Sequence, residues 1–277
     1  MKKIISAILA VVMTAAIACS LVSCGASDWE KIKKEGEFVC GITLYEPMNY
    51  CTTPNDMSTL TGFDTELAQL VAKELGVKVK FQVIDWKNKY IELNGGTIDC
   101  IWNGFTSNSK DDDGVDRKDK VDFTYAYLDN AQCVVVKSDR LASITSASSL
   151  QGLVGTAEAD SAGASFAKTV TSKTLIEKGS QMDTFTEVMT GAAQFAVVDV
   201  LLAEKIVGQG DYAGLAIASN VSIDKEVYSI GCRKNSDFDE KINEALVKLL
   251  NEGKIEALAE KYDVHVTDEL LSKKTAK

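Results

Sequence analysis

The order of apolar and polar positions along this chain switches repeatedly between two periods. From Phe63 to Leu75 apolar residues recur every three or four positions, as on one face of a helix, and Gly76 ends the pattern. From Val77 to Val83 apolar residues alternate with two lysines and a glutamine, which is the period of a half-exposed strand. Alternating helices and strands predict parallel β-sheets covered by helices.

The same alternation continues along most of the chain. Helices are expected at residues 28–35, 63–75, 87–93, 161–170, 184–190 and 200–207, with two more across 238–262 that are separated at Gly253. Strands are expected at residues 38–43, 77–83, 98–102, 153–155, 195–198 and 228–233. Because the chain has only two prolines, no proline-rich linker divides it, and any two lobes would be joined by extended strands.

The N-terminus follows a different pattern. Two lysines precede an apolar run from Ile4 to Ile17, and the small residue Ser23 stands directly before Cys24. This is the arrangement of a secretory signal, and the cysteine resembles that of a bacterial lipobox. An ordinary signal peptide or a membrane-spanning helix is the alternative, although the apolar run is short for a span. We expect residues 1–23 to be removed and Cys24 to carry a lipid that anchors the protein outside the cell membrane, or in the periplasm of a Gram-negative organism.

Charge and composition exclude several classes of function. Without the first 23 residues, 28 basic residues face 40 acidic ones, a net charge of −12. So acidic a protein binds neither nucleic acid nor an anionic lipid surface through its overall field. The remaining length suits one large domain or two modest ones, and 45% apolar residues supply a core. His265 is the only histidine and lies near the C-terminus, so we expect no catalytic triad.

The cysteines do not form a recognisable framework. Cys19 would leave with the signal, and five remain beyond the proposed anchor: Cys40, Cys51, Cys100, Cys133 and Cys232. Their odd number and wide spacing argue against both a disulfide framework and a zinc site. All except Cys51 lie in apolar runs that look like strands, one of them at 133–136. We therefore expect buried free thiols, while whether any of them pair is left open.

Polar residues follow two of the expected strands. Asn103, Gly104 and Thr106 come just after the strand at 98–102, and ligands of open parallel sheets bind at the carboxyl ends of strands. A plain exit from the strand into a loop is the alternative. Asp199 follows a second apolar strand, where a carboxylate either holds an ammonium group or caps the next helix.

Two further residues offer anion-binding groups. Arg117 is one of three arginines, and its planar guanidinium matches a carboxylate, although a single arginine is most often a surface charge. Ser161 begins its own helix and offers an N–H and a hydroxyl. The acidic run at 111–113 does not fit a calcium loop, because Ser109 and Lys120 would stand at the first and last ligand positions. We therefore expect a solvated acidic loop and no metal.

Taken together, these segments resemble the polar amino acid substrate-binding proteins of ABC importers, which have the type II periplasmic-binding-protein fold. The resemblance covers residues 28–265, and Gly62-Phe63-Asp64 is its most specific local part. The matching segments are 45–50, 61–68, 85–86, 103–106, 116–117, 121–127, 155–161 and 196–199. It implies an α/β fold of two lobes, each a central mostly parallel sheet flanked by helices, joined by two hinge strands. Lobe 1 would comprise 24–129 and 222–277, and lobe 2 would comprise 130–221.

The resemblance also implies a ligand site made of Tyr45, Trp86, Asn103, Gly104, Thr106, Arg117, Ser161 and Asp199. Arg117 would hold the α-carboxylate of an amino acid, helped by Ser161 and Thr106. Asp199 would hold the α-ammonium, helped by the carbonyl of Gly104 and by Thr106. Tyr45 and Trp86 would form walls of the side-chain pocket.

The sequence departs from the family pattern at three points. Ile42 stands where relatives that bind basic amino acids carry an acid, which favours a neutral or polar ligand over a basic one. Asp160 stands in a segment where Gly-Ser-Thr is typical, and its charge either faces the ligand carboxylate or turns outward. The segment before Arg117 is longer than usual, so that assignment depends on the Val-Asp-Phe at 121–123.

The function implied is capture of an amino acid by hinge closure and its delivery to an ABC permease in the membrane, by a monomer without cofactor. The same fold hosts a cyclohexadienyl dehydratase, so an enzyme is the main alternative, but the absence of a suitable histidine argues against acid–base catalysis here. A sensing domain is a further alternative, which would need a membrane span or a signalling domain to follow.

Overall fold

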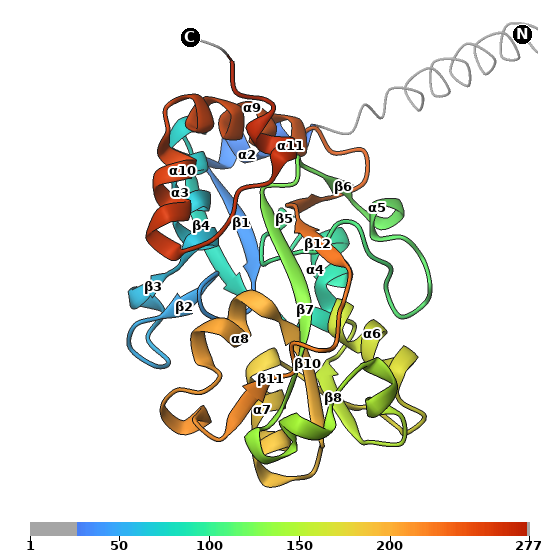
Figure 1. The fold of residues 1–277 in the computed structure, drawn as a ribbon. Coiled ribbons are helices and arrows are strands. Elements are labelled where there is room, and N and C mark those ends of the chain that lie inside the picture. The colour runs from blue at the N-terminus through green and yellow to red at the C-terminus, as the bar shows by residue number, and fades with distance from the viewer. Residues whose placement is uncertain (1–26, 276–277) are drawn as a thin grey trace, which may run out of the picture.

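A computed structural model describes residues 27–275, and their strands form two main sheets, one in each of two lobes (Figure 1). The lobe 1 sheet has the order β4-β1-β5-β13-β6, made of Lys78–Val83, Glu37–Ile42, Cys100–Ile101, Gly231–Cys232 and Asp122–Phe123. The lobe 2 sheet has the order β11-β7-β10-β8-β9, made of Leu215–Ile217, Leu128–Lys137, Phe195–Asp199, Gly155–Glu158 and Ile176–Lys178.

Helices cover both faces of the lobe 1 sheet, because successive strand residues point to opposite faces. Cys100 packs in the large core under α2, α3, α9 and α10, whereas its neighbour Ile101 packs in a smaller cluster beside α4. These helices are Asp28–Glu35, Phe63–Leu75, Phe238–Asn251, Lys254–Tyr262 and Lys89–Gly95.

Lobe 2 repeats this arrangement with fewer helices. Three helices pack on its sheet: α6 (Ala162–Val170), α7 (Gln181–Thr190) and α8 (Val200–Ile206). Residues of β7, β10 and α6 bury a second core between the sheet and the segment around Leu150. Glu158 and Asp199 stand at the carboxyl ends of β8 and β10, and both line the cavity that faces lobe 1.

The remaining elements are short. They are α5 (Arg117–Lys120), α11 (Asp268–Leu271), the paired strands β2 (Tyr50–Cys51) and β3 (Leu60–Thr61), and the 3₁₀ helices at Met57–Thr59, Trp86–Asn88, Ser138–Ser143, Ala147–Leu150 and Gly210–Tyr212. None of the described helices is long and apolar enough to cross a membrane. Residues 1–23 and Cys24, which carry the predicted signal and lipid anchor, lie outside the described residues.

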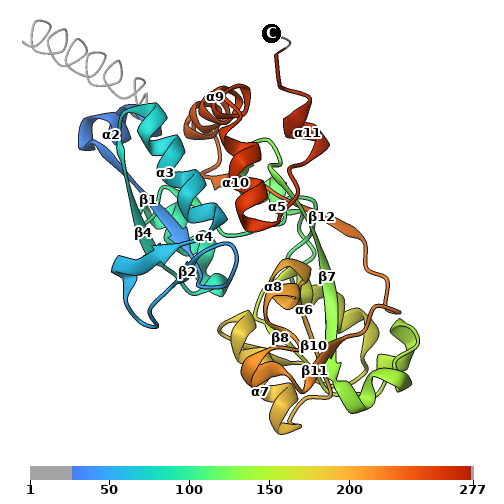
Figure 2. The same cartoon turned by 60° about the vertical axis from the view of Figure 1, so that its left-hand side comes forward.

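Two strands connect the lobes. The first half of β7 pairs antiparallel with β12 (Lys225–Tyr228), and the second half of β7 belongs to the lobe 2 sheet. Figure 2 shows β7 and the chain that leads into β12 passing between the two lobes. The predicted boundary at residue 130 falls within β7, and the predicted boundary at 221 lies four residues before β12. These two boundaries stay predictions.

The predicted two-lobed α/β fold is confirmed, with more antiparallel pairing than expected. In each five-stranded order four strands run in one direction, and the fifth runs in the opposite direction. That fifth strand is β13 in lobe 1 and β7 in lobe 2, and it pairs antiparallel with both of its neighbours in that order. The strongly periodic segments were predicted to within a few residues, including the separation of α9 from α10 at Gly253.

The short strands were predicted less well. The strand expected at 98–102 is only Cys100–Ile101, and the strand expected at 153–155 begins where that range ends. The single strand expected at 228–233 is two strands, β12 and β13, with a break between them. β9 and β11 were not predicted, because strands of three residues are too short to show a period.

All five cysteines of residues 27–275 are free, and all but Cys51 are buried, as expected. Cys40, Cys100 and Cys232 stand side by side on three neighbouring strands. Burial raises the pKa of the Cys100 and Cys232 thiols, so both stay protonated at neutral pH.

Candidate ligand-binding site between the lobes

A small, partly enclosed cavity lies between the lobes, and its empty space measures about 260 Å³ when the open space at its mouth is included. Seven of the eight predicted site residues line it: Trp86, Asn103, Gly104, Thr106 and Arg117 from lobe 1, and Ser161 and Asp199 from lobe 2. The structure adds three polar residues that the sequence analysis missed: Gln132, Glu158 and Gln181. That any of these residues binds a ligand stays a prediction.

The guanidinium of Arg117 is buried and firmly held. Its Nε donates to Oδ1 of Asp111 at 2.9 Å, and its two terminal nitrogens donate to the carbonyls of Thr106 at 3.1 Å and Asp160 at 3.4 Å. The ring of Phe105 lies 5.2 Å from the guanidinium carbon. Because the Asp160 carbonyl belongs to lobe 2, Arg117 also connects the two lobes.

The expectation of a solvated acidic loop at 111–113 is wrong for Asp111, which is 4% exposed. Its carboxylate lies 2.9 Å from Nζ of Lys120 and accepts the hydroxyl of Tyr90 at 2.6 Å, in addition to its pair with Arg117. Burial opposes ionisation, but the charges of Arg117 and Lys89 hold the pKa of Asp111 below its usual range. Asp111 is therefore the anionic centre of a buried cationic cluster.

Asp160 turns towards lobe 1, which answers the question that the sequence left open. Its Oδ2 lies 2.5 Å from Nζ of Lys89, whose side chain is fully buried. Burial and the charge of Arg117 lower the pKa of Lys89. Its ammonium also lies above the rings of Trp86 and Tyr90, at 4.9 and 4.7 Å. The Lys89–Asp160 pair is thus a direct ionic contact between the lobes.

Asp199 is the last residue of β10 and is held by three amides. Its Oδ1 accepts from Asn130 at 2.8 Å and from Gln132 at 2.6 Å, and its Oδ2 accepts from Gln181. It stands at the N-cap of α8 but makes no capping hydrogen bond, so capping is not the role of its side chain. Burial raises the pKa of Asp199, against the opposing effect of these hydrogen bonds.

Glu226 on β12 is a second buried acid beside the cavity. Its Oε2 accepts from Thr106 at 3.1 Å, from Asn130 at 3.1 Å and from Gln132 at 2.9 Å. Burial and the nearby charge of Asp199 raise its pKa to about 7. Glu226 was not predicted as a site residue, because a glutamate in a half-polar strand looks like an exposed one in the sequence.

Glu158 is the third buried acid, at the end of β8. It is 4% exposed, and within residues 27–275 its Oε1 has no hydrogen-bond partner. Burial and the charge of Asp199 raise the pKa of Glu158 to about 8. One sequence signal was available: Glu158 ends an apolar run in the same way as Asp199 does.

Ser161 offers less than the sequence analysis expected. Its N–H donates to the carbonyl of Glu158 at 3.3 Å, and its Oγ accepts from the N–H of Ala164 at 3.0 Å, which caps α6. The hydroxyl proton remains for donation to a ligand. The first N–H groups of α6, at Ala162 and Gly163, start beside the cavity.

The loop of residues 103–106 is fixed by lobe 1. The N–H of Gly104 donates to Oδ2 of Asp64 at 2.9 Å, so the first turn of α3 holds this loop in place. Oδ1 of Asn103 accepts from the N–H of Thr43 and from Asn49, at 2.7 and 2.9 Å. The side chain of Asn103 therefore positions the loop, whatever its backbone contributes to the cavity.

Of the two aromatic residues that were predicted to form walls of the pocket, Trp86 lines the cavity and Tyr45 does not. Trp86 is 4% exposed and packs edge-to-face on Phe105, with ring centroids 5.2 Å apart. Tyr45 is not among the cavity-lining residues. A Cβ atom on Gly104 would lie 1.9 Å from the hydroxyl of Tyr45, so Tyr45 packs directly behind the loop.

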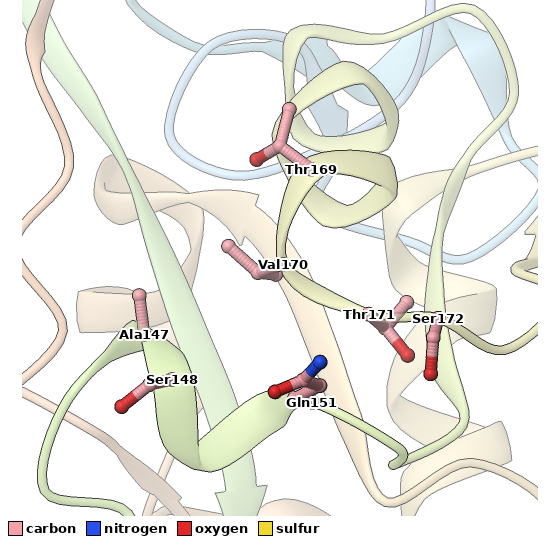
Figure 3. A pocket seen from close by; sticks show the side chains of 7 residues that line it. All are labelled: Ala147, Ser148, Gln151, Thr169, Val170, Thr171 and Ser172. Atoms are coloured by element: carbon pink, nitrogen blue, oxygen red, sulfur yellow. The ribbon is translucent and has the colours of Figure 1, made fainter.

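A second, larger hollow lies on lobe 2 at the junction of residues 147–151 with the end of α6 (Figure 3). Its side chains are uncharged and mostly hydroxyl-bearing: Ala147, Ser148, Gln151, Thr169, Val170, Thr171 and Ser172. Because it contains no charged group, it cannot pair the two charges of a zwitterion. No group of histidine, cysteine, aspartate or glutamate within residues 27–275 is arranged to hold a metal ion.

Comparison with known proteins gives one consistent result. The family model "Bacterial extracellular solute-binding proteins, family 3" matches residues 39–265. The L-cystine-binding protein TcyA of Bacillus subtilis is 34% identical over 50% of this chain, and the match covers 52% of that protein. The arginine-binding extracellular protein ArtP of Bacillus subtilis is 23% identical over 92% of this chain and 96% of its own length.

The fold agrees with this result. A substrate-binding protein of an ABC uptake transporter from Streptococcus pneumoniae, solved with bound histidine, matches this chain with a TM-score of 0.73. The two are 26% identical, and the match covers 86% of this chain and 96% of that one.

Proposed function

Because this chain belongs to the bacterial extracellular solute-binding proteins of family 3, we propose that it captures an amino acid between its two lobes. The family is one of binding proteins rather than enzymes. The named relatives bind cystine, arginine and histidine, which supports an amino acid as the ligand here.

One observation carries the proposal: Arg117 from lobe 1 and Asp199 from lobe 2 line the same cavity. Three of the five N–H groups of Arg117 are donated within the protein, which leaves two for a ligand carboxylate. Asp199 supplies the opposing charge for an α-ammonium. A zwitterion buried between them has both charges paired, as burial requires.

Contacts that exist only when the lobes meet would favour the closed form. The cavity residues come from both lobes, and β7 and β12 are the strands that connect them. A ligand that touches both lobes would therefore stabilise closure, with rotation at the connecting strands near Asn130 and Val221. The closed monomer would be the form that an ABC permease recognises.

The test is a thermal-shift screen of the mature protein against the twenty amino acids, followed by calorimetry of those that stabilise it. Arg117→Ala should weaken binding by about a hundredfold or more, because it leaves the ligand carboxylate unpaired. Arg140→Ala is the matched control, since Arg140 is an exposed arginine of lobe 2. Equal affinity of Arg117→Ala and the unmodified protein would refute this assignment.

The N-terminal prediction completes the proposal. Cys24 would carry the lipid that keeps the protein at the outer face of the membrane, near its permease. Replacement of Cys24 by serine should move the protein from the membrane fraction to the soluble extracytoplasmic fraction. Retention of the Cys24→Ser protein in the membrane would show that the anchor is something else.

A further inference from the structure

The three buried acids beside the cavity differ in the hydrogen bonds that their carboxyl oxygens accept. Asp199 and Glu226 accept hydrogen bonds from side-chain amides and a hydroxyl. Glu158 has an oxygen that is buried and accepts none from residues 27–275. A buried carboxylate oxygen without a partner costs free energy, so its presence in a cavity indicates a group that is still to be bound.

Lys89 and Arg117 on the lobe 1 side lower the pKa of Glu158, but each of them pairs directly with another acid. Lys89 pairs with Asp160 at 2.5 Å, and Arg117 pairs with Asp111 at 2.9 Å. Each of these cations therefore already has an anionic partner of its own. Among residues 27–275, Arg117 is the only lysine, arginine or histidine that lines the cavity.

An amino acid with an uncharged side chain brings no net positive charge to balance the buried acids beside the cavity. Its α-carboxylate and α-ammonium cancel each other, and its ammonium is used by Asp199 under the proposed function. Glu158 and Glu226 would then remain as two further acids in a closed, dry space. Burial raises the pKa values of Glu158 and Glu226, and the negative charge of Asp199 raises both further.

We propose that Glu158 binds a cationic group on the ligand side chain, so that the protein selects basic amino acids over neutral ones. This inference rests on the proposed function, since it assumes that an amino acid occupies the cavity. An ammonium or guanidinium group donates to both oxygens of a carboxylate and favours its charged form. Glu158 is thus assigned as a specificity-determining residue.

Position 42, which favoured a neutral ligand in the sequence analysis, does not bear on the cavity. Ile42 is fully buried in the lobe 1 core and is not among the cavity-lining residues. Glu158, at the end of β8 in lobe 2, is instead the acid that would meet a basic side chain. The absence of an acid at position 42 is therefore no argument against a basic ligand.

The test uses two pairs of ligands that have nearly the same shape but differ in charge: lysine with norleucine, and arginine with citrulline. Calorimetry on the unmodified protein should show at least one cationic member binding about tenfold or more tightly than its neutral partner. In Glu158→Gln this preference should fall to less than about threefold, mainly through weaker binding of the cationic member. Glu204→Gln removes the same charge from an exposed position of lobe 2 and should keep the preference.

The outcomes separate this inference from the proposed function. If neutral amino acids bind as tightly as their cationic partners, the assignment of Glu158 is wrong and amino acid capture still stands. The same holds if Glu158→Gln keeps the full preference. If no amino acid binds the unmodified protein, the proposed function fails, and this inference fails with it. The comparison on the unmodified protein needs no variant, so it remains decisive even if Glu158→Gln does not fold.

Discussion

Nε of Arg117 donates to Oδ1 of Asp111 at 2.9 Å, and each of the two side chains is only 1% exposed. The pair fixes one edge of the guanidinium, so that the other edge is presented to the cavity between the lobes. Asp111 also balances Lys120, whose Nζ lies 2.9 Å from its second oxygen. An acidic residue that looks like part of a surface loop is thus what holds the proposed carboxylate-binding group.

Asp111→Asn should therefore destabilise the protein and weaken ligand binding together. The substitution leaves Arg117 and Lys89 as buried cations without their shared anion, which costs about 3 kcal/mol of unfolding free energy. Ligand affinity should fall by about tenfold, because the guanidinium loses the contact that orients it. Urea denaturation and calorimetry measure the two effects.

Asp113→Asn is the control, because Asp113 belongs to the same acidic run but its side chain is 56% exposed. It should change neither quantity appreciably. If the two variants behave alike, the buried pair does not have the role described.

Most of the fold was predicted from the periodic spacing of apolar residues. The helix α3 and the strand β4 show their period over 13 and 6 residues, and both were predicted almost to the residue. Strands such as β9 and β11 are held by their neighbours in the sheet rather than by a pattern of their own, so nothing in the local sequence indicated them.

The site was predictable only where residues follow strands. The loop after β5 and the acid at the end of β10 were found in that way. The burial of Asp111 depends on Lys89, which lies 22 positions earlier in the chain, and Glu158 depends on a cavity that both lobes form. Contacts of this kind come from the packing of lobes, and a single sequence does not show them.

The carboxyl of Asp64 should make stability depend on pH. Burial raises its pKa to about 6, against the hydrogen bonds that it accepts from Tyr127 and from the N–H of Gly104. The folded protein therefore binds more protons at this site than the unfolded chain does between about pH 4 and 6. The stability that Asp64 contributes is therefore fully present below about pH 4. It decreases by about 3 kcal/mol as the pH rises through about 6.

Asp64→Asn isolates this effect, because asparagine does not titrate. As the pH rises from 4.5 to 7, the unfolding free energy of the unmodified protein should fall relative to that of Asp64→Asn. Urea denaturation at several pH values measures it. A difference that is constant over this range would mean that the Asp64 pKa is not raised.

Gly104→Ala should disrupt the loop that borders the cavity. Gly104 has φ +54°, and an added Cβ would lie 1.9 Å from the hydroxyl of Tyr45. The loop or Tyr45 must move, so we expect a loss of about 2–4 kcal/mol in stability and of measurable ligand binding. Thermal unfolding and calorimetry would show both.

Gly114→Ala is a matched control, since Gly114 also has positive φ, at +78°, but an added Cβ there meets nothing within 4 Å. It should cost only the backbone strain, about 1 kcal/mol, and leave ligand affinity unchanged. Equal losses in the two variants would show that strain alone, rather than the contact with Tyr45, makes a glycine necessary at position 104.

Asp160→Asn should weaken the closed form without damaging either lobe. Asp160 has φ +58°, a conformation that asparagine tolerates, so the backbone should be retained. The substitution removes the anion that lies 2.5 Å from the buried ammonium of Lys89 on the other lobe. Opening the lobes would then return Lys89 to water, so the balance shifts towards the open form and ligand affinity falls by about tenfold.

Small-angle X-ray scattering of the ligand-free protein would detect this shift as a larger radius of gyration in Asp160→Asn. Asp112→Asn is the comparison, because Asp112 also contacts lobe 2, through Lys168 at 2.6 Å, but both side chains are partly exposed. That exposed pair should contribute much less, since water already solvates its charges. If Asp160→Asn binds its ligand as tightly as the unmodified protein and scatters identically, the Lys89–Asp160 contact does not stabilise closure.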